Sequence, residues 1–224
     1  MDLIQYLIAP YKEYSIPFII LESVAVIFGV WSVLLSIRKN IWVYPTGIIS
    51  TAIYVYIMFQ AGLVGDTLIN LYYTVMSVYG WITWYRVKVD AVHVQVTRAT
   101  RKEWAWAGLL FILSIIGVSI IYYYKPLLND ASLQVRDLNW DHLDWANVLD
   151  MITTSIFLVG MWFMARQKVE NWLFWIVGDA ICIPMTIYKD LGLTALQYLI
   201  FTILAIDGYI KWKRSAVVGQ SNQQ

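Results

Sequence analysis

Seven long apolar segments dominate this sequence. Hydrophobic residues make up 60% of the chain and charged residues only 14%, which lies outside the usual range of soluble domains. A helix needs about 20 mostly apolar residues to cross the hydrocarbon core of a bilayer. We therefore expect an all-α integral membrane protein with seven transmembrane helices. The expected spans are residues 17–37, 41–59, 66–85, 104–124, 145–165, 172–188 and 194–212.

The basic residues gather in the connections on one side of the expected bundle. That side holds twelve of the sixteen Lys and Arg residues. Because the more basic side of a membrane protein faces the cytoplasm, we expect a cytoplasmic C-terminus and an N-terminus outside. The opening "MDLIQYLIAP" has no early Lys or Arg, so it does not resemble a cleavable signal peptide. We expect residues 1–16 to form an interfacial segment.

An internal repeat relates the two halves of the chain. "GVW" at 29–31 recurs as "GMW" at 160–162, and "YGWITWYR" at 79–86 resembles "DGYIKWKR" at 207–214. Three spans, one connecting span and three more spans predict a 3+1+3 arrangement of parallel repeats, similar to SWEET transporters. The expected boundaries are 17–86 for the first repeat, 87–144 for a linker with connecting helix 104–124, 145–213 for the second repeat, and 214–224 for a cytoplasmic tail.

Four carboxylates lie inside the expected spans, away from their first and last residues: Glu22, Asp150, Asp179 and Asp207. A charged side chain at the bilayer centre costs at least ~2.5 kcal/mol, so each is a candidate functional group. The spans contain no Lys or Arg except at the inner end of the last. Such a bundle suits a cationic or neutral solute and not a phosphate, which requires Arg or Lys. Glu22 and Asp150 occupy matching depths in the two repeats, and we expect a gating or structural role for them.

The stretch "ENWLFWIVGDAICIPMTIYK" at 170–189 places Asp179 in the middle of an apolar segment. At about 100° per residue, Trp172, Trp175 and Asp179 lie within roughly 60° of one helix face. Aromatic faces attract organic cations by ~0.5 to 2 kcal/mol, and a carboxylate accepts N–H donors from a heterocycle. We expect this face to bind the substrate. Alternatively, Trp172 belongs to an interfacial aromatic belt and Asp179 bonds a neighbouring hydroxyl.

Further polar groups lie on the third and last spans. The stripe that begins with Asn70 and Tyr73 suits a water-lined path or interhelical hydrogen bonds. In the last span Asp207 precedes Lys211 by four residues, so a simple ion pair at the helix surface is an open alternative to a binding role. The expected substrate-binding residues are Trp175, Asp179, Asn70, Gln197, Tyr73, Asp207, Trp172, Phe201, Ser50 and Tyr54.

No sequence motif indicates an enzyme. Neither a phosphate-binding P-loop nor a dinucleotide fingerprint is present, and Cys182 has no histidine near it in the sequence to act as a base. His93 and His142 lie in separate loops without ligand spacing, so we expect no metal and no cofactor. The net charge of +1 gives no indication of nucleic-acid binding.

The segments "GLVGDTLINLYYTVMSVYGWITW" (62–84) and "VENWLFWIVGDAICIPMTIYKDLGLTALQYLIFTILAIDGYIKW" (169–212) resemble the PnuC-type vitamin transporters. The resemblance extends over the chain from the first span onward. It implies a bacterial inner-membrane protein with the 3+1+3 fold and homotrimeric assembly. It also implies facilitated diffusion of an unphosphorylated vitamin precursor, which a cytoplasmic kinase traps by phosphorylation.

Within this resemblance, three positions indicate the substrate. Nicotinamide riboside carriers of the family tend to have Asn at the positions of Asp179 and Asp207, and Gln at the position of Asn70. The two aspartates therefore resemble the thiamine (PnuT) branch. We expect thiamine as the substrate, with nicotinamide riboside as the alternative, since both are cations. The sequence is also compatible with a receptor that binds the vitamin without transporting it, or with a channel.

Overall fold

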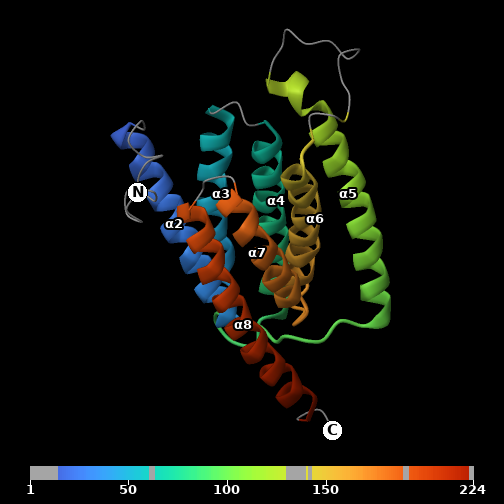
Figure 1. Ribbon diagram of the computed structural model, residues 1–224. Helices are drawn as coiled ribbons and strands as arrows, with labels where there is room; N and C mark the ends of the chain where they lie inside the picture. Colours follow the sequence, from blue (N-terminus) through green and yellow to red (C-terminus); the bar gives the residue numbers. More distant parts are fainter. Residues whose placement is uncertain (1–14, 61–63, 130–139, 141–142, 189–191, 222–224) are drawn as a thin grey trace.

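The structure is a computed structural model that describes residues 15–60, 64–129, 140, 143–188 and 192–221. Each expected span corresponds to one helix within these residues (Figure 1). The expected segment 1–16, apart from its last two residues, and most of the loop after residue 129 lie outside the described residues. The helices are α2 (Ile16–Ile37), α3 (Val43–Gln60), α4 (Val64–Val87), α5 (Arg101–Asn129), α6 (Trp145–Ala165), α7 (Asn171–Tyr188) and α8 (Gly192–Ser221).

Four of the described helices are long and apolar enough to cross a membrane on their own: α2, α5, α6 and α7. The chain is thus a multi-pass, all-α membrane protein. Helices α3, α4 and α8 have 18, 24 and 30 residues, so length does not distinguish them from the other four. Hydroxyl, amide and charged residues reduce the apolar character of these three helices; α4 contains Arg86, and α8 contains Asp207 and Lys211.

The helices form two groups of three. In the first helix group α3 packs against α2 and α4, and in the second helix group α7 packs against α6 and α8. Contacts of α4 with α6 and of α2 with α8 join the two groups. Helix α5 packs mainly against α6 and lies at one edge of the bundle (Figure 1). The space between the two helix groups is therefore bounded by six helices.

Helices α2 and α6 end in matching turns. Lys39 has φ 58° and Gln167 has φ 56°, in the left-handed region that costs a residue other than glycine about 1–2 kcal/mol. The N–H of Lys39 donates to the carbonyl of Ser36 at 2.8 Å, and that of Gln167 to the carbonyl of Met164 at 2.9 Å. The N–H of Asn40 donates to the carbonyl of Leu35 at 3.0 Å, and that of Lys168 to the carbonyl of Phe163 at 2.9 Å, so both turns are Schellman caps.

The linker at residues 88–100 crosses both of these turns. The N–H of Val94 donates to the carbonyl of Lys39 at 3.1 Å, and the N–H of Thr97 donates to the carbonyl of Gln167 at 3.0 Å. Val94 and Val96 are buried and belong to the main hydrophobic core. One segment of the linker thus bonds to both helix groups at the end that carries most of the basic residues. We call this the basic end; it is at the bottom of Figure 1.

Two buried tryptophans form reciprocal hydrogen bonds between the helix groups. The indole N–H of Trp84 in α4 donates to the carbonyl of Met164 in α6 at 3.0 Å. The indole N–H of Trp212 in α8 donates to the carbonyl of Ser36 in α2 at 2.9 Å. Both side chains are fully buried, and their ring centroids lie 5.8 Å apart. The paired indoles therefore join the two groups at the basic end of the bundle.

The double variant Trp84→Phe/Trp212→Phe should lower the thermal unfolding midpoint in detergent. Each change removes one buried hydrogen bond, worth about 1 kcal/mol, while the ring packing is largely kept. Trp106→Phe is the control, because Trp106 is 55% exposed. An equal midpoint for the double variant and the control would contradict a joining role for the indole N–H groups.

Gly208→Ala should also destabilise the protein. A Cβ at Gly208 would lie 2.6 Å from Cε2 of the buried Trp172, and overpacking of this kind costs about 1–3 kcal/mol. Gly108→Ala is the matched control, since a Cβ there meets no atom within 4 Å and Ala is the better helix former. Thermal unfolding should show a lower midpoint for the first variant only; equal midpoints would count against close packing at Gly208.

Candidate functional site

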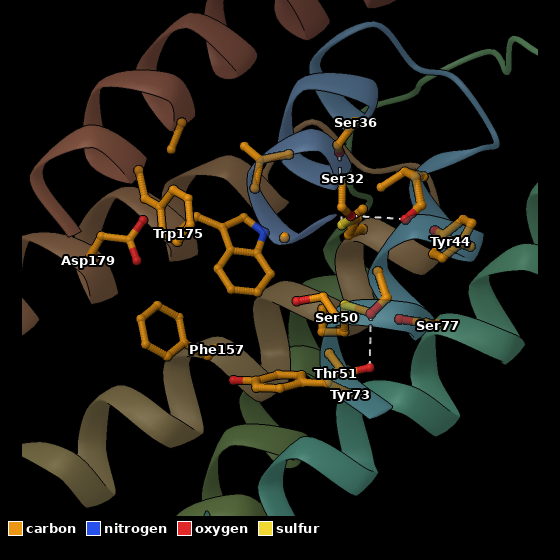
Figure 2. A pocket seen from close by; sticks show the side chains of 18 of the residues that line it. Ser32, Ser36, Tyr44, Ser50, Thr51, Tyr73, Ser77, Phe157, Trp175 and Asp179 are labelled. Atoms are coloured by element: carbon orange, nitrogen blue, oxygen red, sulfur yellow. Dashed lines mark hydrogen bonds between the residues drawn. The ribbon is translucent and has the colours of Figure 1, made fainter. Parts of the chain in front are cut away.

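A cavity of about 300 Å³ lies between the two helix groups. Its wall receives side chains from every described helix except α5. Figure 2 shows that the two groups contribute different chemistry: Phe157, Trp175 and Asp179 lie on one side, and the labelled serines and Tyr44 on the other. The volume is at the lower end of the range for small-molecule sites.

The second helix group supplies an aromatic wall. The ring of Phe157 in α6 stacks on the indole of Trp175 in α7, with centroids 5.4 Å apart and an interplanar angle of 24°. Gly178 permits this approach, because a Cβ there would lie 2.3 Å from Cε1 of Phe157. Asp179 follows one helical turn after Trp175, so a carboxylate stands beside the stacked rings. Phe201 of α8 also lines this wall.

Asp179 is 4% exposed and makes no hydrogen bond or ion pair with any residue that the structure describes. No Lys, Arg or His lines the cavity. Burying an unpaired carboxylate is unfavourable unless a partner compensates it. An organic cation, or a heterocycle with N–H donors, supplies that compensation. Among the described residues no cluster of three His, Cys, Asp or Glu side chains forms a metal site.

The first helix group supplies a wall of hydroxyl groups. Ser32 Oγ donates to the carbonyl of Val43 at 2.9 Å, and Ser50 Oγ donates to the carbonyl of Ala25 at 2.8 Å. A hydroxyl has one proton to donate and lone pairs to accept. Because the protons of these two serines are committed to backbone carbonyls, the oxygens are available to the cavity as acceptors. The wall therefore suits a solute that carries hydroxyl donors.

The structure brings together six of the ten side chains expected to bind substrate. Trp172 is 3% exposed and packs edge-on against Trp212, with centroids 5.6 Å apart. It therefore belongs to the interior and not to an interfacial belt. The six residues in the cavity wall are Trp175, Asp179, Tyr73, Trp172, Phe201 and Ser50.

Asp207 lies outside the cavity, which corrects the expectation that it faces the substrate. Lys211 Nζ donates to Asp207 Oδ2 at 2.6 Å, and the two side chains are 57% and 43% exposed. The spacing of four residues produces a helix-surface ion pair. Asn70, Gln197 and Tyr54 are also absent from the cavity wall, although they were expected there.

Glu22 and Asp150 do not line the cavity either. Each of the two residues has at least one interaction. Their gating or structural role stays a prediction.

Several cavity residues were not anticipated, among them Ser32, Ser36, Phe157 and Tyr198. In α2 a signal was present: Gly29, Ser32 and Ser36 recur at spacings of three and four residues, which puts small and polar groups on one face of an otherwise apolar helix. Phe157 and Tyr198 are aromatic residues in apolar helices, and no pattern distinguishes them from ordinary core positions.

Comparisons with known proteins identify a family and several relatives that this chain resembles. The family described as "Nicotinamide mononucleotide transporter" matches residues 19–214. The nicotinamide riboside transporter PnuC of Escherichia coli is 23% identical over 208 residues, which cover 88% of this chain and 86% of that protein. The riboflavin/roseoflavin transporter RibM of Streptomyces davaonensis is 24% identical over 194 residues, covering 85% of this chain and 83% of that protein.

A solved structure shows the same fold. The crystal structure of the vitamin B3 transporter PnuC matches with a TM-score of 0.66 and 22% identity, over 96% of this chain and 89% of that one. The named relatives are transporters and not enzymes. Because the family match extends over most of the sequence, this chain belongs to the PnuC-type family of membrane transporters.

Proposed function

We propose that this protein is a carrier that moves an unphosphorylated, cationic vitamin precursor through the cavity between the helix groups. The observation that carries the proposal is Asp179, a buried carboxylate in the cavity wall without a partner among the described residues. The solute supplies the missing positive charge or N–H donors. A phosphate group is disfavoured, because the cavity wall has no Lys or Arg to hold it.

Nicotinamide riboside is the leading candidate substrate. Both the Escherichia coli and the Neisseria mucosa relatives are named nicotinamide riboside transporters, so the comparisons favour it over thiamine, which the sequence had put first. Its pyridinium ring suits the aromatic wall beside Asp179, and its ribose hydroxyls suit the acceptors of Ser32 and Ser50.

Thiamine remains the second candidate because of Asp179. This is the one departure from the nicotinamide riboside pattern that lies in the cavity wall, since Asp207 and Asn70 are outside it. A carboxylate accepts two N–H donors, which matches the amino group of an aminopyrimidine.

The transport mechanism that we propose rests on the similarity of the two helix groups. The Schellman turns at Lys39 and Gln167 and the donors Trp84 and Trp212 are each separated by the same number of residues along the chain. This regularity supports a 3+1+3 arrangement of parallel repeats, with all seven helices spanning the membrane. The groups rock about the bound solute, and the paired indoles separate when the basic end opens.

The orientation and partners follow from the same proposal. The basic end lies in the cytoplasm of a bacterium, with the N-terminus outside the inner membrane. Facilitated diffusion toward the cytoplasm is completed by a kinase that phosphorylates the solute, because the phosphorylated product no longer fits the cavity. The assembly is a homotrimer, as the resemblance implies.

Counterflow in proteoliposomes tests the function. Liposomes preloaded with unlabelled nicotinamide riboside should take up labelled nicotinamide riboside transiently without an ion gradient. The same assay with labelled thiamine compares the second candidate with the first. Nicotinamide mononucleotide should not compete with nicotinamide riboside for uptake. Saturable binding without counterflow would indicate a receptor, and conductance without saturation would indicate a channel; either result would contradict the carrier.

Asp179→Ala should weaken solute binding by about tenfold or more. The change removes a charge-assisted hydrogen bond worth about 1.5–3 kcal/mol. Asp207→Ala is the matched control, because Asp207 forms an exposed ion pair and such pairs contribute at most about 1 kcal/mol to stability. Isothermal titration with both variants measures the difference. Equal solute affinities for the two variants would show that Asp179 is not part of the binding site.

A further inference from the structure

A second hollow lies outside the shared cavity, at the basic end between α5 and α6. It has a volume of about 760 Å³ and opens beside the helix that stands at the edge of the bundle (Figure 1). We call it the α5–α6 groove. Its wall includes Lys102, Glu103, Trp106, Leu109, Leu113, Arg166 and Lys168.

The rim of the groove is positively charged. Three cations, Lys102, Arg166 and Lys168, line it together with one carboxylate, Glu103. Glu103 Oε1 pairs with Lys168 Nζ at 2.9 Å and with Arg166 Nη2 at 3.4 Å. Lys102 is exposed and has no ion-pair partner among the described residues. One carboxylate therefore offsets one of three positive charges, and the rim has charge left for an anion.

Below the rim the groove is apolar. Trp106 follows one turn after Lys102, and tryptophan is common where a transmembrane helix meets the membrane interface. Leu109 and Leu113 come next, and they are 44% and 57% exposed. From Lys102 to Leu113 the helix rises about 16 Å, which is roughly half the thickness of the hydrocarbon core. The groove thus changes from cationic to apolar over the depth of one bilayer leaflet.

We propose that the α5–α6 groove binds an anionic glycerophospholipid. The phosphodiester lies between Lys102 and Arg166, and an acyl chain runs along Leu109 and Leu113. Basic pockets between transmembrane helices on the cytoplasmic side are suited to acidic headgroups. A free phosphate would leave the leucine wall uncovered, and a zwitterionic headgroup would leave the positive charge of the rim uncompensated. The cationic rim matches an acidic headgroup and the apolar wall matches an acyl chain, so the groove favours an acidic lipid.

Native mass spectrometry of the full chain from mild detergent tests this site. The probes are phosphatidylglycerol and phosphatidylcholine with identical acyl chains. Phosphatidylglycerol should be retained about tenfold more, since the basic residues of the rim attract an anionic headgroup. Lys102→Gln/Arg166→Gln should reduce its retention to the level of phosphatidylcholine. The control Arg86→Gln/Arg214→Gln removes the same charge at the same end, away from the groove, and should leave retention unchanged.

A second variant separates the groove from a general charge effect. Leu109→Trp/Leu113→Trp fills the apolar wall without a change in charge and should also lower phosphatidylglycerol retention. Equal retention of the two lipids, or equal losses in the groove and control variants, would overturn the proposal. Competition by free glycerol 3-phosphate, or an oligomer of this chain that carries no lipid and dissociates in the groove variants, would overturn it as well.

Discussion

The reciprocal hydrogen bonds of Trp84 and Trp212 are the interaction on which the rest of the structure depends. Each indole reaches across from the last helix of one group to a backbone carbonyl near the end of the first helix of the other. Those carbonyls belong to the Schellman turns at Lys39 and Gln167, which the linker also binds. The two helix groups are thereby joined at the basic end. In the proposed carrier, these contacts break when the basic end opens.

The cavity combines two walls that a small cation can use at once. Trp175 and Phe157 offer stacked rings, and Asp179 stands beside them without a hydrogen-bond or ion-pair partner among the described residues. Across the cavity, Ser32 and Ser50 offer acceptors only, because their protons bond backbone carbonyls. Acceptors on both sides favour a solute that is cationic and rich in hydrogen-bond donors. The same composition disfavours phosphate, which is compatible with the proposed trapping of the solute by phosphorylation.

The sequence predicted the helices well, because the length of an apolar segment is set by the membrane and can be counted. It also led to Asp179, since a lone carboxylate in such a segment is costly. The sequence alone could not show that Asp179 lines the cavity whereas Asp207 does not. The environment of Asp207 depends on where Lys211 points in the packed helix. The turns at Lys39 and Gln167 had no signal at all: glycine is the usual residue there, and the left-handed backbone is imposed by the packing around it. The linker pairing was missed for the same reason, since it requires both turns to be in place.

The most direct test of the central claim is a structure of the protein with nicotinamide riboside bound. The account predicts density for the solute in the cavity between the helix groups, with its charged ring against Trp175 and within hydrogen-bonding distance or ionic contact of Asp179. Ordered solute elsewhere in the bundle, with the cavity between Trp175 and Ser50 unchanged, would contradict it.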